Sequence, residues 1–523
     1  MKTKYLNTIL LASLMVLAAS CKKFLDVKPV GKLIPEKAEE LENLLNNSST
    51  LDYHFIDNNR GSYYALLGDN FQISENQAKY SYVSTHPNID RYAAYTFYQP
   101  YENPRNPQYA WDWGIYRALG LFNNVIEGVK ALPGAADSEL GKRITAQAKA
   151  GRAWSMMVGT LGYGPMFDPN GQNNTKVLPY RTSANPNDPN PDLSTTGQAF
   201  ELIEKDLKDA LAATPDNVGN PSRANTSAVH ALLAQFYMYK RDWPKMSEHA
   251  KEAWARSMAV KGGVDNMIYN LNTFSYKPNP NASPTPGTDV EVVLELQGPD
   301  LLLGQSENRE NLFFRLAPSG TSHYPSQEFL DLFDKTTDRR YKLFALKALG
   351  YSTTVGGIKY DDGIVTRYYR DSKMQGSQGV SSQGITYPEL LLMKAEASAR
   401  LNDLGGALAD LNLLRKYRYS GAITDLVNGG TLGQDALLFE ILKERRREMP
   451  IGTFQRVFDI KRYAFDTGKP WSKTSITHTI GAKVYKGDVN NTYFTMRISN
   501  NVIQLNPQWG LTPWEGTYDP ASR

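Results

Sequence analysis

Hydrophobic residues recur every three to four positions along much of the chain, which is the spacing of one face of an α-helix. The clearest run covers 116–132, whose apolar face consists of Leu119, Phe122, Val125, Ile126 and Val129. The pattern continues over 139–161 and over 200–213, where Thr196 is placed to cap the helix. An earlier helix is predicted to begin at Pro35, because proline favours the first helical position.

Two later segments, 227–258 and 386–419, are similar to each other. Each pattern predicts an apolar helix, a short turn and a second helix, with the turns at Arg241-Asp242 and Asn402-Asp403. Because 259–385 separates the two segments, we expect a platform of helical hairpins assembled from distant parts of one chain.

Small residues in these hairpins resemble those of the tetratricopeptide repeat, in which they let paired helices approach closely. Ala395 and Ala407 have the repeat spacing in the second segment. Ala234 and Met246 occupy the equivalent positions in the first, where the methionine departs from the pattern.

Long irregular stretches lie between the predicted helices. The segments 163–193 and 276–288 are rich in proline, asparagine and glycine, which predicts loops. Alternating apolar residues over 290–296 and 364–369 predict short strands. The expected fold is therefore mostly α, with long irregular loops and a few short strands.

The composition of the 523 residues excludes several classes of protein. A single cysteine excludes an internal disulfide framework, a multi-cysteine zinc site and an iron–sulfur cluster. The 58 basic and 54 acidic residues give a net charge of +4, so no overall field favours nucleic acid and we expect none as a partner.

The N-terminus has the features of a bacterial lipoprotein signal. Lys2 and Lys4 precede a short apolar run over 9–19, and small residues lead directly to Cys21. In bacterial lipoproteins such a cysteine carries a diacylglyceryl group and becomes the first mature residue. We therefore expect a signal peptide over 1–20 and a lipidated tether over 21–34, against the alternative of a free buried cysteine after an ordinary signal peptide.

Motifs of known enzymes and metal sites are missing from the sequence. Its six histidines form no HExxH motif, and GxSxG, GxGxxG and GK[ST] do not occur. Asp168-Pro169-Asn170 and Asn187-Asp188 resemble calcium loops but lack an EF-hand pattern, which favours solvated turns over a structural calcium. We expect no cofactor, while paired carboxylates for glycoside hydrolysis stay open because they need no fixed sequence spacing.

The run EILKERRR over 440–447 permits two interpretations. Arg445, Arg446 and Arg447 are candidates for an anion site. Glutamates interleaved with the arginines favour instead a surface helix with ion pairs, some of them partly buried.

Tyrosine is the outlier of the composition, with 31 residues, roughly twice its usual share. Its flat ring and hydroxyl suit the apolar faces and hydroxyl groups of sugars, so an aromatic, polar surface favours a carbohydrate over a lipid. For any single ring, packing in the core or a loop is an equal alternative. The candidate ligand-binding residues, taken from aromatic clusters and loops, are Tyr64, Tyr98, Tyr101, Trp111, Tyr276 and Tyr324.

Several segments together resemble the SusD/RagB family of outer-membrane lipoproteins. They are CKKFLDVKP at 21–29, ELENLLNN at 40–47, WDWGIYRALGLFNNVIE at 111–127, TYPELLLMKAEASAR at 386–400 and ERRREMPIGTFQRVFDIKRY at 444–463. The chain departs from the family pattern at Ile451, where a glutamate is usual before glycine, and at LGYGP over 161–165.

The resemblance implies a SusD-like fold of tetratricopeptide-type hairpins over 35–523, with halves of about 35–220 and 221–523. It implies a non-catalytic protein, anchored in outer-membrane lipid through Cys21 and facing the cell exterior. Such proteins capture a glycan, or in some members a peptide, and deliver it to a SusC-like TonB-dependent barrel. The family assigns a structural role to the ERR segment and transfers no ligand-binding residue. The alternatives are a secreted or surface-attached glycan hydrolase and a purely structural scaffold.

Overall fold

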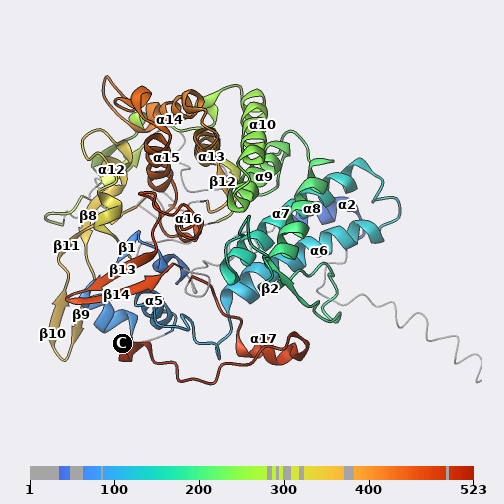
Figure 1. The fold of residues 1–523 in the computed structure, drawn as a ribbon, viewed down its shortest axis with the longest axis horizontal. Coiled ribbons are helices and arrows are strands. Elements are labelled where there is room, and N and C mark those ends of the chain that lie inside the picture. The colour runs from blue at the N-terminus through green and yellow to red at the C-terminus, as the bar shows by residue number, and fades with distance from the viewer. Residues whose placement is uncertain are drawn as a thin grey trace, which may run out of the picture.

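The computed structural model describes residues 35–46, 63–83, 86–278, 285–289, 294–298, 308–316, 323–369, 382–489 and 494–523. Helices dominate this part of the chain and the strands are short, so the predicted mostly α fold is confirmed (Figure 1). Cys21 and the segments predicted to be a signal peptide and a tether lie outside the described residues. Within the described ranges, no helix combines the length and the apolar character that crossing a membrane requires.

The helices fall close to the predicted ranges. Two predicted boundaries are wrong, since the first described helix begins at Ala38 instead of Pro35, and Thr195 instead of Thr196 caps α8. The Thr195 hydroxyl accepts a hydrogen bond from the Gln198 backbone amide, and the Thr195 backbone amide donates one to Oε1 of the Gln198 side chain. The α-helices are α2 (Ala38–Leu44), α4 (Glu75–Gln77), α5 (Asn88–Tyr95), α6 (Tyr116–Ala131), α7 (Glu139–Tyr163), α8 (Thr196–Leu211), α9 (Thr226–Lys240), α10 (Trp243–Lys261), α11 (Gln327–Leu330), α12 (Arg339–Phe344), α13 (Tyr387–Arg400), α14 (Leu404–Arg418), α15 (Gln434–Glu448), α16 (Gln455–Tyr463) and α17 (Asn500–Leu505).

The described strands pair two by two and antiparallel, and both predicted strand segments contain one. The pairs are β1 (Phe71–Gln72) with β7 (Tyr324–Pro325), β2 (Lys176–Pro179) with β3 (Leu193–Thr195), β4 (Ser275–Pro278) with β5 (Leu294–Gln297), β6 (Asn311–Phe313) with β12 (Ile385–Thr386), β8 (Ala345–Leu349) with β11 (Ile364–Tyr368), β9 (Ser352–Val355) with β10 (Ile358–Asp361), and β13 (Ser475–Ile480) with β14 (Lys483–Asp488). Short strands also occur inside the two segments predicted to be loops.

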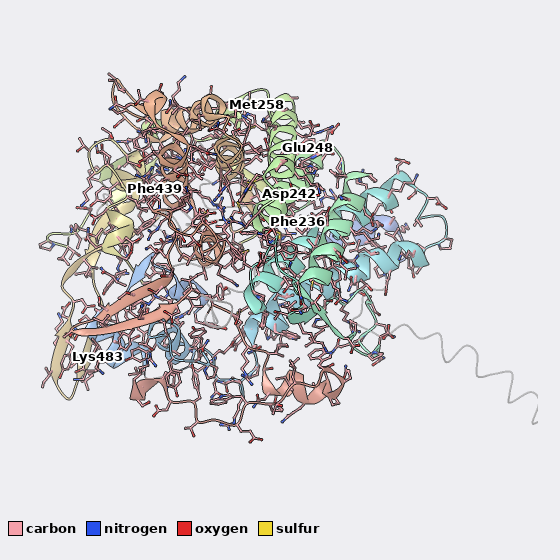
Figure 2. All side chains as sticks on the ribbon, viewed as in Figure 1. Phe236, Asp242, Glu248, Met258, Phe439 and Lys483 are labelled. Carbon is pink, nitrogen blue, oxygen red and sulfur yellow. The ribbon has the colours of Figure 1, made fainter. Side chains whose placement is uncertain are left out.

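The two predicted helical hairpins are present and turn in the same way. Arg241 and Asn402 end the first helix of each pair in left-handed backbone, with φ of 61° and 64°. The next residue, Asp242 or Asp403, caps the second helix by accepting a hydrogen bond from the backbone amide three residues later. Figure 2 shows Asp242 at the turn, with Phe236 on α9 and Glu248 and Met258 on α10.

The hairpins pack against each other although 125 residues lie between α10 and α13, from Gly262 to Thr386. Helix α10 contacts α13, and α15 contacts both α13 and α14. At the repeat positions, Ala234, Met246, Ala395 and Ala407 are all fully buried. Helices α6 to α10 and α13 to α15 form a row that curves across the molecule, and the pairs β8–β11, β9–β10 and β13–β14 lie at its open side (Figure 1).

One hydrophobic core connects the described chain from Leu41 to Trp509. A small satellite of Leu346, Ala348 and Tyr369 lies beneath the β8–β11 pair. The long loops therefore pack on one continuous core. Segments from both halves of the sequence line the same clefts.

Candidate functional site

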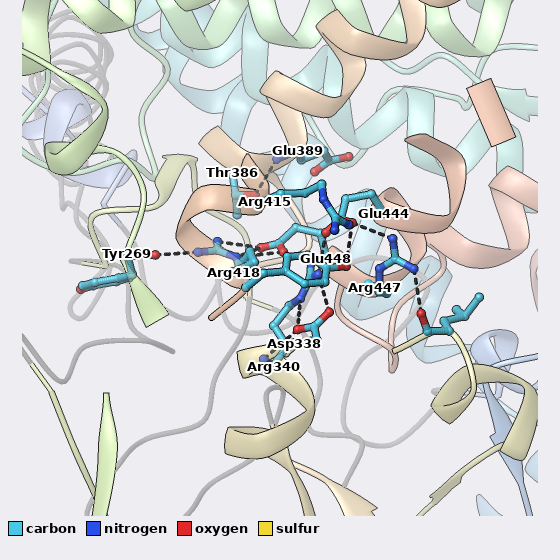
Figure 3. Close-up of polar contacts among 12 residues, drawn as sticks. Tyr269, Asp338, Arg340, Thr386, Glu389, Arg415, Arg418, Glu444, Arg447 and Glu448 are labelled. Carbon is cyan, nitrogen blue, oxygen red and sulfur yellow. Dashed lines mark hydrogen bonds and ion pairs between the residues drawn. The ribbon is translucent and has the colours of Figure 1, made fainter. Parts of the chain in front are cut away.

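The arginine run is buried, so the part of our interpretation that placed it on the surface is wrong and the part that predicted ion pairs is right. Arg445, Arg446 and Arg447 are at most 6% exposed, and Glu444 and Glu448 at most 4%. Figure 3 shows carboxylates and guanidinium groups alternating through this cluster. Protein groups surround the three arginines, which therefore do not form an open anion site.

Arg340 of α12 lies at the centre of this network (Figure 3). Its guanidinium donates to Asp338 at 2.7 Å, Glu444 at 2.6 Å and Glu448 at 2.8 Å. Glu448 also accepts a hydrogen bond from Arg418 at 2.8 Å, and Arg447 donates to Glu444 at 2.6 Å. Helices α12, α14 and α15 are joined through these contacts.

The network sets the ionisation of its carboxylates. Burial alone would raise the pKa of Glu444, but the charges of Arg340 and Arg447 outweigh burial and lower it to about 2. Arg462 and Arg400 have the same effect on Glu396, whose pKa is also lowered to about 2 against the effect of burial. Both groups are ionised at neutral pH and serve packing, which agrees with the structural role implied by the resemblance.

Four of the six candidate aromatic residues are buried. Tyr64 is fully buried, while Tyr101, Trp111 and Tyr324 are 4%, 6% and 5% exposed. The Tyr64 ring packs edge-on against Phe458, and its hydroxyl donates to the carbonyl of Phe494. Tyr64 offers no ring face to solvent, whereas Tyr101, Trp111 and Tyr324 lie at or behind the walls of clefts described below.

The other two candidates, Tyr98 and Tyr276, are half-buried. The Tyr276 hydroxyl donates to the carbonyl of Leu343, so this residue joins β4 to α12. The Tyr98 hydroxyl donates to the carbonyl of Thr517 and accepts from the amide of Asp519. Tyr98 thus fastens the C-terminal segment, residues 510–523, which we call the strap.

Several groups hold the strap against the N-terminal half, where it runs from the region of α17 back towards α5 (Figure 1). The Tyr518 hydroxyl lies 2.6 Å from Asp90 Oδ1 and 3.0 Å from the carbonyl of Tyr101. Trp514 exchanges two hydrogen bonds of 2.8 Å between its backbone and the Asn500 side chain. These contacts fix the backbone of Trp514, and the residue as a whole is half-buried.

Trp514 of the strap lines a cleft of about 370 Å³, which we call the strap cleft. A guanidinium lies near the Trp514 ring, since Arg105 is 5.5 Å from the ring centroid. The volume lies within the range of small-molecule sites, and the lining combines aromatic rings with amide, guanidinium and carboxyl groups. The lining residues are Tyr63, Gln99, Pro100, Tyr101, Glu102, Gln108, Thr495, Met496, Arg497 and Trp514.

Glu102 supplies the strap cleft with an unusual carboxyl group. Burial and the nearby charge of Asp90 raise its pKa well above its ordinary value, in opposition to a hydrogen bond with Tyr63. Within the described part of the chain, Glu102 Oε2 is buried and has no hydrogen-bond partner. A buried polar atom of this kind is costly unless paired, so a ligand hydroxyl would gain by bonding to it.

A second cleft, of about 500 Å³, lies between η2 (Ala78–Tyr82), α5, β11 and the turn that joins β8 to β9. We call it the arginine cleft, because two of its lining residues are Arg91 and Arg367. Tyr324 lies behind this cleft, with its ring centroid 6.0 Å from the Arg367 guanidinium. The other lining residues are Gln77, Ser81, Tyr82, Asn88 and Tyr351.

Trp111 lines a third cleft, of about 290 Å³, together with Tyr116, Asn123, Arg181 and Asn190. Its neighbour Trp113 is 48% exposed and lies beside the Arg117 guanidinium. Trp111 itself packs against Tyr116, Tyr163 and Trp509, so it joins the helix row to the residue that directly precedes the strap.

The two loops that resembled calcium sites are closed by their own side chains. Asp168 Oδ1 accepts from the Asn170 amide, and Asp188 accepts from Ser183 and Asn185. Among the described residues, no group of three or more histidine, cysteine, aspartate or glutamate side chains is arranged to hold a metal ion.

Comparison with known proteins decides the family. The model described as "SusD family" matches residues 319–508, and the model described as "Starch-binding associating with outer membrane" matches residues 23–238. The chain belongs to the SusD family. No curated protein matches the sequence.

Several solved structures share the fold of this chain at low sequence identity. A SusD superfamily protein from Bacteroides thetaiotaomicron superposes with a TM-score of 0.63 at 17% identity, covering 90% of this chain and 98% of its own. A putative sugar binding protein from Bacteroides vulgatus superposes with a TM-score of 0.61 at 17% identity, covering 91% of this chain and 98% of its own. Surface glycan-binding protein A from Bacteroides uniformis superposes with a TM-score of 0.55 at 15% identity, covering 90% of this chain and 98% of its own.

The residues most open to a ligand are not the ones selected from the sequence. Trp514, Arg497, Arg91, Arg367 and Tyr351 line the two larger clefts, and only Tyr101 among the candidates does so. Trp514 follows Pro513 in an irregular C-terminal stretch, a setting similar to that of the candidate aromatic residues. The same argument from the sequence could therefore have predicted Trp514 as a ligand-binding residue. The arginines had no distinguishing pattern.

Proposed function

We propose that this SusD-family protein is a cell-surface lipoprotein that captures a glycan in the strap cleft and delivers it to a SusC-like TonB-dependent barrel, without catalysis. It is anchored to the outer membrane through acylated Cys21 and faces the cell exterior. The described residues and the family relationship support this assignment, and the proposal includes no cofactor.

The strap cleft is the observation that carries the proposal. Its lining includes the half-buried Trp514, whose ring suits the apolar face of a sugar ring. Gln99, Arg497 and Glu102 supply donors and acceptors from the surrounding walls, which matches the hydroxyl groups of a sugar.

The anchor and the transporter partner are supported by the sequence and the family. The short apolar leader followed by Cys21 favours lipid attachment, and two acyl chains hold a protein stably on a membrane. The name of the model that matches 23–238 refers to association with the outer membrane. Tethering next to a transporter raises the effective concentration of captured ligand, so modest affinity at one site suffices.

Replacing the Trp514 ring tests the binding site. Trp514→Ala should weaken retention by the recognised polysaccharide in affinity electrophoresis by about tenfold, the equivalent of about 1.4 kcal/mol. Trp113→Ala is the matched control, because Trp113 is 48% exposed but lies outside the strap cleft. Equal retention of both variants and the wild type would place the glycan elsewhere.

Two further measurements address the rest of the proposal. Release of oligosaccharide products by the purified protein would overturn the non-catalytic assignment and favour the hydrolase alternative.

Membrane solubilisation followed by affinity capture of the chain should recover a TonB-dependent barrel. Recovery of the chain alone, from membranes that retain both proteins, would contradict the partner.

A further inference from the structure

Two histidine side chains meet between the helices of the α9–α10 hairpin. His230 lies on α9 and His249 on α10, and their Nδ1 atoms are 3.0 Å apart. The two rings are tilted by 36°, with their centroids 5.2 Å apart. Both residues are half-buried, and they lie within the continuously described stretch 86–278. Neither residue lines one of the three clefts described above.

The contact between the rings directs a nitrogen lone pair into the space between the two helices. A hydrogen bond between two Nδ1 atoms needs one to donate its N–H and the other to accept, so the accepting imidazole is neutral. Burial lowers the pKa of His230 to about 4 and also lowers the pKa of His249 below its ordinary value. Both rings are therefore neutral at pH 7, which is the form of imidazole that binds a metal ion.

The separation of the two nitrogens fits the coordination of a single ion. Bonds from a metal to imidazole nitrogen are about 2.0 to 2.1 Å long. Two such bonds place their nitrogens about 2.9 Å apart at a right angle and about 3.3 Å apart at the tetrahedral angle. The observed 3.0 Å lies between these values. An ion can therefore replace the shared proton after a small rotation of each ring, with little movement of either helix.

A neighbouring tyrosine holds one of the rings in place. The Tyr237 ring stacks on His249 at an interplanar angle of 5°, with the centroids 5.5 Å apart. The Tyr237 hydroxyl donates to Glu204 Oε1 at 2.8 Å, which links the stacked rings to α8. A ligand ring that is already oriented by its neighbours loses little further freedom when it binds an ion.

Charged side chains of both signs surround the pair. Glu248 directly precedes His249 and is exposed on α10 (Figure 2). The carboxylates of Glu248 and Glu252 favour a positive charge at His230. The groups whose charges act on one or both histidines are Glu204, Glu248, Glu252, Lys208, Lys245 and Arg256. Carboxylates and cations are equal in number among these six, so as a set they do not repel a divalent ion.

We propose that His230 and His249 form a binding site for a divalent transition-metal ion, with water molecules completing its coordination. Imidazole nitrogen suits copper, nickel and zinc, whereas calcium and magnesium prefer oxygen ligands. The separation of 3.0 Å is closer to the right-angle value, which favours copper and nickel over tetrahedral zinc. Within the described chain no third histidine, cysteine, aspartate or glutamate completes the group, so water fills the other positions. The bound ion joins α9 to α10 and is separate from glycan capture.

Titration of the untagged protein with Cu²⁺ tests the proposal. With one equivalent of Cu²⁺, the electron paramagnetic resonance spectrum should show splitting from two imidazole nitrogens. Cu²⁺ should also raise the melting temperature, because only the folded chain holds both rings together. His230→Gln and His249→Gln should each weaken Cu²⁺ binding by about tenfold or more in calorimetric titration. His86→Gln is the matched control and should bind as the wild type does, because the His86 ring contacts Tyr109 and Asp90 instead of a second imidazole.

Three outcomes would overturn the proposal. The first is a wild-type spectrum with one coordinated nitrogen or none, and this measurement does not depend on whether either glutamine variant folds. The second is equal Cu²⁺ affinity of the wild type and both glutamine variants, since the ion would then bind elsewhere. The third is Mg²⁺ or Ca²⁺ binding at the same site as tightly as Cu²⁺, because oxygen ligands would then be responsible.

Discussion

Two buried cations are held by carbonyl oxygens and aromatic rings. Arg315 donates to the carbonyls of Ser222 and Phe314, and its guanidinium lies 4.1 Å from the centroid of the Phe313 ring. Lys461 Nζ donates to the carbonyls of Leu161 and Gly164, at the C-terminal end of α7. Burial lowers the pKa of Arg315 to about 9 and that of Lys461 to about 7.

Lys461 should make stability depend on pH above neutrality. Its folded pKa of about 7 lies below the unfolded value of about 10.4, so the unfolded chain binds more protons between these limits and stability rises with pH there. Compared with Lys461→Met, the wild type should gain about 1 to 2 kcal/mol in unfolding free energy between pH 7 and 9. Urea unfolding at each pH measures this difference, and parallel pH profiles for the two proteins would contradict it.

At the scale of single elements, α15 shows how a charged helix can be a core helix. Its last two turns place Glu444, Arg445 and Glu448 among partners from α12, α13, α14 and α16. The depressed pKa of Glu444 lies below its unfolded value, so its contribution to stability is present above about pH 4.3 and is lost as the pH falls towards 2.

A matched pair of substitutions on α15 tests this assignment. Glu444→Gln should lower the free energy of unfolding by about 3 kcal/mol or more, because Arg340 and Arg447 keep buried charges without their shared partner. Glu440→Gln, one turn earlier, removes only a partly exposed pair with Lys443 and should cost about 0.5 kcal/mol or less. Similar denaturation midpoints for the two variants would show that the buried network does not stabilise the fold.

For the whole molecule, the described residues form one body around a continuous core, and the expected attachment point lies outside them at Cys21. The helix row supports the clefts, while the strap brings the C-terminus to residues 90–105. A lipid anchor at the opposite end of the sequence would hold the protein at the membrane without a membrane-spanning segment. Neither cleft would then need to enter the bilayer.

Replacing the single cysteine tests the anchor. Cys21→Ser removes the thiol that would carry the diacylglyceryl group, so the protein should move from the membrane fraction to the soluble fraction or the medium. Its thermal unfolding should match that of the wild type body. Retention in membranes after a carbonate wash would contradict attachment through Cys21.

Features of the fold that depend on neighbouring residues could be predicted from the sequence alone. Apolar spacing located the helices, and Arg241-Asp242 and Asn402-Asp403 located the hairpin turns, because turn and cap chemistry acts over three or four residues. The composition and the segments at 21–29 and 444–463 were enough to recognise the family.

Which charges and rings are exposed depends on tertiary packing and could not be predicted from the sequence. Arg340 and Glu444 are 104 residues apart, and Tyr518 and Asp90 are 428 apart, so no local pattern reveals that they meet. The same folding buries Tyr64 and leaves Trp514 half-exposed. Local sequence specifies the periodicity of an element, whereas burial depends on which distant elements pack against it, and the clefts exist only where those distant elements come together.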